Sequence, residues 1–175
     1  MSKRLFDILI SLIMLVPTLP MILALGILIR FNSKGPAIFR QQRVGRYEKP
    51  FTVLKLRTMT VGTPELGTHE VSTSHVTGMG AFLRRCKLDE LPQLINVLKG
   101  EMSLVGPRPC LPVQKELVEA RRSLGVYSLR PGITGLAQVE HIDMSDPQKL
   151  AVRDADYLKS NGFVNDIVLC VRTLL

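Results

Sequence analysis

A long uncharged run interrupted by two prolines limits how this 175-residue chain can fold. Residues 8–29 contain no Asp, Glu, Lys or Arg. As a straight α-helix the run would be about 33 Å long, enough to cross a hydrocarbon core of about 30 Å. Pro17 and Pro20 each remove a helical hydrogen bond and disfavour helical backbone at the preceding residue. We therefore expect a bend or break at residues 16–20.

The charges that flank the run bear on its topology. Lys3 and Arg4 precede it, and further Lys and Arg residues follow it from Arg30 onward, so the positive-inside rule gives no orientation for a single crossing. A helix that enters the bilayer, breaks at the prolines and returns would keep both flanks on one face. We therefore favour a re-entrant hairpin over residues 1–34, with a plain spanning helix as the alternative. No small-residue cleavage site follows the run, as a signal peptide would require.

Residues 35–175 have the composition of one globular domain, which we expect to be mainly helical with a small β-hairpin. Phe51, Val53, Lys55 and Arg57 alternate with other residues and predict a strand with a basic face. Helix signals are found over 79–86, 92–99, 113–124 and 148–175.

Two segments of this domain remain ambiguous or irregular. Residues 60–80 lack periodicity and predict a mobile loop, in which His69 and His75 do not have metal-ligand spacing. The last helical segment carries apolar residues at three- and four-residue spacing, which suit either core packing or a membrane interface. They are Phe163, Ile167, Val168, Val171 and Leu174.

Composition narrows the class of partner. The formal charge of +8 favours an anionic partner: nucleic acid, acidic lipid or a phosphorylated small molecule. Because the chain has no Trp, few aromatic residues and no RRM, KH or zinc-finger signature, we expect no nucleic-acid partner. The cysteines (Cys86, Cys110 and Cys170) lack CxxC spacing, which favours neither a disulfide framework nor a zinc site and is consistent with a reducing cytosol.

The pair Asp89-Glu90 is the strongest local candidate for chemistry. Pro92 predicts that the pair lies at or just before a helix N-terminus, where negative charge is favoured. A capping role is the simpler alternative, but two acids exceed what a cap needs. Arg84, Arg85 and Lys87 lie just upstream, and such a cluster can hold Mg²⁺ and a phosphate together.

Two basic turns stiffened by proline and glycine accompany the pair. Residues 105–109 (VGPRP) and 129–135 (LRPGITG) each offer one arginine, Arg108 and Arg130, whose planar fork matches a phosphate. The Walker A loop, GxGxxG, GxSxG and HExxH motifs are missing.

Taken together, these motifs resemble the small monotopic phosphoglycosyl transferases, bacterial enzymes that initiate glycan assembly on a polyprenol carrier. The resemblance rests on the proline-broken hydrophobic hairpin and on the runs KLRTM (55–59), LDELPQLINVLKGEMSLVGPRP (88–109) and RPGITGLAQV (130–139). It covers residues 3–175, and we expect the minimal catalytic form. It implies transfer of a sugar 1-phosphate from a UDP-sugar to undecaprenyl phosphate, with release of UMP, at the cytoplasmic face of the bacterial inner membrane.

The resemblance also implies roles for individual residues. Asp89 would be the nucleophile that carries the phospho-sugar, and Glu90 would bind metal or manage a proton. Both would contact Mg²⁺, or Mn²⁺ in its place. Phosphate or nucleotide contacts are implied for Lys55, Arg57, Arg84, Arg108 and Arg130, and supporting roles for Asp154 and Tyr157. Relatives often have Ser-Pro at the membrane break, whereas Leu19-Pro20 stands here, so Thr18 must supply any hydroxyl that satisfies freed carbonyls.

Two other classes of function remain open at this stage. One is a non-catalytic membrane adaptor that binds anionic lipid or a partner protein, and the other is a nucleic-acid module tethered to the membrane. The acidic pair argues against both, because a surface that only binds polyanions gains nothing from carboxylates at its centre.

Overall fold

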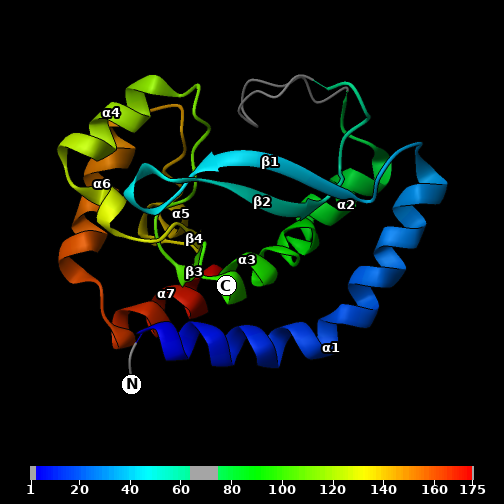
Figure 1. The fold of residues 1–175 in the computed structure, drawn as a ribbon, viewed down its shortest axis with the longest axis horizontal. Helices are drawn as coiled ribbons and strands as arrows, with labels where there is room; N and C mark the ends of the chain where they lie inside the picture. Colours follow the sequence, from blue (N-terminus) through cyan, green and yellow to red (C-terminus); the bar gives the residue numbers. More distant parts are fainter. Residues whose placement is uncertain (1–2, 64–74, 175) are drawn as a thin grey trace.

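The computed structural model describes residues 3–63 and 75–174 (Figure 1). His69 lies outside them. The strands are β1 (Ile38–Val44), β2 (Pro50–Leu56), β3 (Ser103–Val105) and β4 (Gly132–Thr134). The helices are α1 (Lys3–Asn32), α2 (Gly78–Arg85), α3 (Gln93–Lys99), α4 (Lys115–Ser123), α5 (Leu136–Val139), α6 (Pro147–Ser160) and α7 (Phe163–Leu174), with single 3₁₀ turns η1 (Arg46–Glu48), η3 (Leu88–Glu90) and η4 (Val126–Ser128).

This architecture confirms a mainly helical chain with a small antiparallel hairpin. Helices α2, α3 and α4 lie within two residues of their predicted bounds. Gly100, at φ 85°, ends α3 and donates its N–H to two carbonyls of the last turn, as a glycine stop predicts. The segment 148–175 is wrong as one helix, because the chain leaves helical geometry at Asn161 and separates α6 from α7.

The hairpin β1–β2 is confirmed, and its predicted basic face is largely buried. Ile38 pairs with Leu56 and Val44 with Pro50. Phe51 and Val53 pack into the main core, and Arg57, just beyond β2, is only 6% exposed. The face that we predicted to be basic is therefore an inner face.

A short parallel pair, β3–β4, was not expected from the sequence. Ser103 pairs with Gly132 and Val105 with Thr134, so the two turns that carry Arg108 and Arg130 are attached to neighbouring strands. The two segments approach so closely that a Cβ built on Gly132 would lie 2.1 Å from the backbone nitrogen of Gly106. The glycines of both motifs therefore permit this close parallel pairing.

Helix α1 is continuous through both prolines and is bent near its middle (Figure 1). The bend is confirmed, whereas a break is not observed. The Thr18 hydroxyl donates to the carbonyl oxygens of Met14 (2.7 Å) and Leu15 (3.3 Å), a bonding pattern that itself favours bending. By length and composition, α1 is long and apolar enough to cross a membrane.

The N-terminal half of α1 belongs to the fold. Arg4 donates to the carbonyls of Val97 (2.6 Å) and Leu98 (2.9 Å) at the end of α3, and Lys3 pairs with the buried Asp166 of α7. The buried carboxylate of Asp7 accepts from the Ser103 hydroxyl and the Leu104 N–H of β3. These contacts join α1 to α3, β3 and α7.

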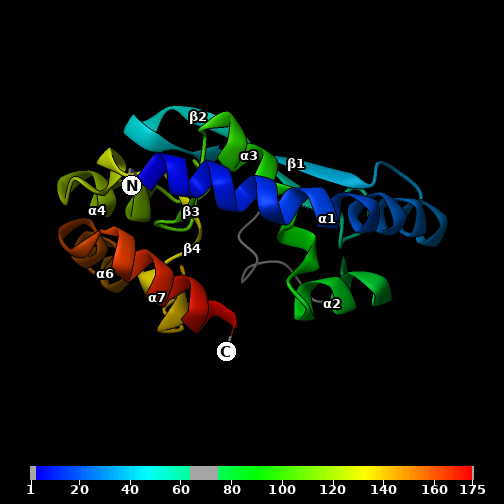
Figure 2. The same cartoon turned by 90° about the horizontal axis from the view of Figure 1, so that it is seen from below.

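The apolar stripe of α7 is exposed. Phe163, Ile167, Val168 and Val171 are 40–51% accessible, and the buried apolar residue of this helix is Leu169. The core interpretation is therefore wrong for these four side chains. Figures 1 and 2 show α7 and the first half of α1 on the same side of the molecule, and the Phe6 and Phe163 rings meet edge to face there.

Candidate active site

Asp89 and Glu90 lie in η3, between α2 and α3. Lys87 adopts left-handed backbone (φ 56°, ψ 18°) and redirects the chain after α2, while Leu91 and Pro92 continue helically into α3. The pair is therefore just before the N-terminus of α3, as Pro92 predicts. The N-cap positions of η3 and α3 are Lys87 and Pro92, so neither Asp89 nor Glu90 is the N-cap residue of either element.

Glu90 is held by two cations. Its Oε1 atom accepts from Lys55 Nζ and from Arg108 Nη2, both at 2.8 Å. Burial pushes the pKa of Glu90 upward, but the charges and hydrogen bonds of Arg108 and Lys55 outweigh it and lower the pKa to about 2. Glu90 is therefore ionised at neutral pH and ties β2 to the turn of Arg108.

Asp89 has the opposite electrostatic environment. It is 8% exposed, and burial, with a smaller contribution from the Glu90 charge, raises the pKa of its carboxyl. Lys55 and Arg84 oppose that rise. A carboxylate whose charge is destabilised by burial is a stronger nucleophile than a solvated one, and nearby cations keep it available in its ionised form.

Lys55 reaches the acidic pair because Asn96 fixes its strand. The Asn96 Oδ1 atom accepts from Leu54 N (3.0 Å), and Nδ2 donates to Thr52 O (2.8 Å), so the side chain occupies the free edge of β2 just before Lys55. Burial lowers the pKa of Lys55, and the adjacent Arg108 lowers it further, while Glu90 opposes the shift.

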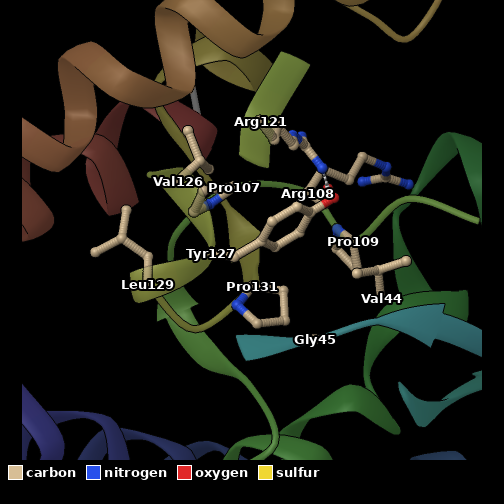
Figure 3. A pocket seen from close by; sticks show the side chains of 10 residues that line it. All are labelled: Val44, Gly45, Pro107, Arg108, Pro109, Arg121, Val126, Tyr127, Leu129 and Pro131. Atoms are coloured by element: carbon tan, nitrogen blue, oxygen red, sulfur yellow. Dashed lines mark hydrogen bonds between the residues drawn. The ribbon is translucent and has the colours of Figure 1, made fainter. Parts of the chain in front are cut away.

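Arg108 is positioned through its backbone. Arg121, 1% exposed, donates from Nη1 to the Arg108 carbonyl oxygen at 2.9 Å (Figure 3). Its Nε and Nη2 atoms donate to Asp154 Oδ2 at 2.9 and 2.6 Å. Asp154 therefore has a supporting role in this structure, whereas Tyr157 donates to Asp166 and to the Val105 carbonyl on β3.

Of the other arginines that the resemblance assigned to phosphate, only Arg84 lies beside the acidic pair. Its Nε donates to Thr58 Oγ1 at 2.9 Å, and its charge acts on Asp89. Arg57 instead donates to the carbonyls of Ser33 and Lys34 and so holds the C-terminus of α1. Arg130 donates to the Gly100 carbonyl at 2.9 Å. The structure does not bring Arg57 or Arg130 into contact with Asp89 or Glu90.

Asp89 and Glu90 line an open cavity of about 2340 Å³. Lys55, Arg84 and Arg108 line it too, Arg57 reaches its wall, and Arg130 is not among its lining residues within the described chain. Apolar side chains from α1, α3 and α7 form another part of the wall: Phe6, Ile10, Leu94, Ile167 and Val171. The cavity therefore joins a charged region to an apolar one.

A second cavity lies behind Arg108, between Tyr127, Pro131 and Gly45 (Figure 3). Its volume of about 10 Å³ holds at most about one water molecule. Of the two cavities, the larger one is therefore the one with room for a ligand.

The acidic pair suits Mg²⁺ only in combination with other ligands. Across residues 3–63 and 75–174, no three His, Cys, Asp or Glu side chains are grouped to hold an ion. Mg²⁺ is commonly bound by one or two carboxylates together with substrate phosphates and water, and the adjacent Asp89 and Glu90 fit that pattern. Substrate oxygens would have to complete the coordination.

Sequence reasoning missed Arg43, Asn96 and Arg121. Arg43 lies on β1 and lines the large cavity, and the other two position Lys55 and Arg108. The alternation of the strand over residues 38–44 could have indicated Arg43. The spacing of residues gives no signal for Arg121, because its partner is 33 residues away.

Comparison with known proteins identifies the relatives of this chain. The profile described as bacterial sugar transferase matches residues 1–175. The chain is 37% identical over 185 residues to a UDP-glucose:undecaprenyl-phosphate glucose-1-phosphate transferase of Caulobacter vibrioides, covering 99% of this chain and 68% of that protein.

Two longer relatives match over nearly the whole chain. A UDP-N-acetylgalactosamine-undecaprenyl-phosphate N-acetylgalactosaminephosphotransferase of Aeromonas hydrophila is 36% identical, covering 98% of this chain and 42% of that protein. An undecaprenyl-phosphate galactose phosphotransferase of Salmonella typhimurium is 36% identical, covering 98% and 39%. The chain thus spans two thirds of one curated relative and about two fifths of the others.

Proposed function

Because the chain belongs to the bacterial sugar transferase family, we propose that it transfers a sugar 1-phosphate from a UDP-sugar to undecaprenyl phosphate and releases UMP, as the first step of a bacterial glycan. The relatives' names contain undecaprenyl phosphate and several different sugars. The observation that carries the proposal is the buried Asp89 beside a Glu90 that two cations hold, on the wall of an open cavity.

In the first step, a carboxylate oxygen of Asp89 attacks the β-phosphorus of the donor. The bond from that phosphorus to the bridging oxygen breaks, and the electron pair leaves with UMP. Lys55, Arg84 and Arg108 surround the acidic pair, so their charges can stabilise the transferring phosphoryl group. The product is an acyl phosphate, the mixed anhydride of the Asp89 carboxyl group and the sugar 1-phosphate.

In the second step, a phosphate oxygen of the lipid attacks the phosphorus of this acyl phosphate. The aspartyl oxygen–phosphorus bond breaks, which restores the Asp89 carboxylate and forms the lipid diphosphate sugar. The apolar walls contributed by α1 and α7 give the isoprenoid chain a way into the same cavity.

Asp89 and Glu90 would hold Mg²⁺, or Mn²⁺, together with donor phosphates. When bound, the ion would offset charge on the diphosphate and on the leaving UMP. Glu90 keeps its negative charge for this contact because its pKa is lowered to about 2.

We propose that the protein lies at the cytoplasmic face of the inner membrane as a monotopic protein. In this arrangement α1 is re-entrant, with its bend inside the bilayer, and the exposed face of α7 lies in the interface. Both α1 and α7 carry exposed apolar residues, and α7 lies beside the first half of α1 (Figures 1 and 2), which supports this placement.

The test is release of UMP by the purified protein in detergent with undecaprenyl phosphate, Mg²⁺ and a panel of UDP-sugars. One sugar should support turnover, and chelation of the metal by EDTA should stop it. With donor alone, the intact mass should increase by one phospho-sugar, mapped by proteolysis to Asp89. No UMP release with any donor would favour the non-catalytic adaptor.

Asp89→Asn should form no adduct, and its turnover should fall at least about 1000-fold, because an amide lacks the nucleophilic charge. Its melting temperature should not fall, since the variant removes a buried charge of raised pKa. Asp156→Asn is the matched control, because Asp156 pairs with Arg153 on the surface of α6, and it should keep full activity. Full activity of Asp89→Asn would contradict the covalent mechanism.

A further inference from the structure

Arg43 is a cation in the large cavity with only neutral hydrogen-bond partners. It lies on β1, where its Nη2 atom donates to Gln41 Oε1 at 2.6 Å and its Nη1 atom donates to the Pro109 carbonyl at 3.1 Å. Its Nε atom is buried and has no hydrogen-bond partner. Among the described ion pairs, Glu90 is taken by Lys55 and Arg108, and none includes Arg43.

Arg43 is held next to Arg108 by the backbone. Val44 N donates to the Cys110 carbonyl at 3.0 Å, directly beside the bond from Arg43 to Pro109, so the end of β1 is fixed on the turn that carries Arg108. Burial and the charge of Arg108 lower the pKa of Arg43 to about 10, which agrees with two guanidinium groups close together. Of these two neighbouring arginines, Arg108 pairs with Glu90, which also pairs with Lys55, whereas no described ion pair offsets the charge of Arg43.

The other buried arginines differ from Arg43 because each has partners that account for its position. Arg121 is buried as well, but Asp154 accepts from it, and Arg57 is bound to the carbonyls at the end of α1. A half-buried guanidinium without an acidic partner is costly, and an anionic ligand in the cavity would offset that cost. Phosphate oxygens suit it best, because a guanidinium donates two parallel hydrogen bonds to them.

We propose that Arg43 and Arg108 together form a phosphate-binding site on the β1 side of the cavity, in which Arg43 is a substrate-binding residue. The proposal rests on the proposed function for the identity of the phosphate, which belongs either to the diphosphate of the donor or to the lipid acceptor. Arg43 would exchange its Gln41 partner for a phosphate oxygen while keeping its bond to Pro109.

A purely structural role and a ligand-binding role for Arg43 predict different effects of Arg43→Gln on the stability of the ligand-free protein. If Arg43 only holds Pro109 in place, Arg43→Gln should lower the melting temperature of the ligand-free protein. If Arg43 awaits an anion, Arg43→Gln should leave that temperature unchanged or raise it. Arg121→Gln serves as the comparison, because it strands the buried Asp154 and should lower the melting temperature under either interpretation.

The experiment measures melting of the full chain in detergent with and without pyrophosphate as the probe. We expect pyrophosphate to stabilise the wild type, and Arg43→Gln to weaken that stabilisation as a 10- to 100-fold rise in Kd, roughly the range for a charged hydrogen bond. Arg43→Lys keeps the charge without the fork and should be intermediate. Arg122→Gln, which removes an exposed arginine of α4, should behave as wild type.

Kinetics then distinguish the two sources of phosphate. A rise in KM for the UDP-sugar with unchanged KM for undecaprenyl phosphate assigns the site to the donor, and the reverse assigns it to the acceptor. Equal stabilisation of wild type and Arg43→Gln by pyrophosphate, or a ligand-free melting temperature that falls as in Arg121→Gln, would overturn the proposal. Failure of the proposed function would appear separately, as no UMP release by a wild type that still binds pyrophosphate.

Discussion

Asp89 and Glu90 are neighbours in the chain, yet their surroundings shift their pKa values in opposite directions. Burial dominates at Asp89, whereas two cations within 2.8 Å dominate at Glu90. Two titratable groups with diverging pKa values are typical of sites in which each has its own chemical task. The more basic carboxylate suits the nucleophile, and the permanently ionised one suits a contact with cations.

These shifts predict how stability depends on pH. Because the folded pKa of Glu90 is about 2 and the unfolded value is 4.5, its ionised form stabilises the folded state above pH 4.5, by about 3 kcal/mol. That contribution is lost as pH falls from 4.5 toward 2. Glu90→Gln should therefore lower the melting temperature by roughly 6–12 °C at pH 7, and by progressively less below pH 4.5.

Asp89→Asn is the matched comparison, since the folded pKa of Asp89 is raised. A raised pKa means that the carboxyl stabilises the fold in its protonated form and loses that contribution as pH rises above 3.8. Melting curves of the two variants between pH 3 and 7 should diverge from wild type in opposite directions. If the melting temperature of Glu90→Gln stays as far below that of the wild type in acid as at pH 7, the ion pairs of Glu90 do not stabilise the fold as proposed.

At this scale, sequence reasoning identified the acidic pair but could not sort the arginines. Arg57 and Arg108 both lie in motifs of the family and both have a planar guanidinium group. Arg57 nevertheless binds the end of α1, whereas Arg108 binds Glu90. The difference depends on which carbonyls lie within reach, and this follows from packing between segments that are distant in sequence. The role of Arg121 could not be predicted for the same reason, because its partner Asp154 is on another helix.

At the scale of secondary-structure elements, the parallel pairing of β3 with β4 was missed because three-residue strands carry no periodicity. Glycine and proline in VGPRP and RPGITG correctly indicated tight backbone, but they could not show that two such segments pair in parallel. The hairpin and the longer helices were predictable because alternation and helix stops are local signals.

The glycines of this strand pair give a prediction. A Cβ on Gly132 would lie 2.1 Å from Gly106 N and 2.4 Å from Thr134 O. Both are backbone atoms, so relieving the clash would require the strands to move apart. Gly132→Ala should therefore destabilise the protein by about 3 kcal/mol and reduce activity, because Arg108 follows Gly106 closely in the chain.

Gly78→Ala is the control, measured by the same denaturation experiment. Gly78 begins α2, has open space where a Cβ would lie and does not need left-handed backbone, so alanine should be neutral or slightly stabilising there. Equal stability of the Gly132→Ala and Gly78→Ala variants would show that β3 and β4 do not approach each other as closely as the structure indicates.

At the scale of the whole molecule, membrane attachment and the active site share the same elements. The first half of α1 is bound to α3, whose N-terminal side carries the acidic pair, and to α7, whose residues line the cavity. The C-terminal end of α1 is held by Arg57, next to the strand that carries Lys55. The geometry of α1 should therefore set where the cavity lies relative to the membrane.

Replacing the two prolines tests this coupling together with the topology. In a variant without Cys86, Cys110 and Cys170, single cysteines at positions 2 and 33 should both be protected from an impermeant periplasmic reagent in intact cells if α1 is re-entrant. Leucine at positions 17 and 20 should straighten the uncharged run to about 33 Å, so that position 2 becomes labelled while position 33 stays protected.

Turnover should fall in the same double variant, because a straight α1 cannot keep both its contact with α3 and its attachment to Arg57. Pro112→Leu, at an exposed position before α4, controls for loss of a proline and should keep wild-type labelling and activity. Labelling of position 2 but not of position 33 in the chain with both prolines would mean that α1 spans the membrane. The re-entrant topology would then be wrong, while phosphotransfer by Asp89 would still stand, since that chemistry depends on the residues around the acidic pair and not on the side of the membrane that position 2 occupies.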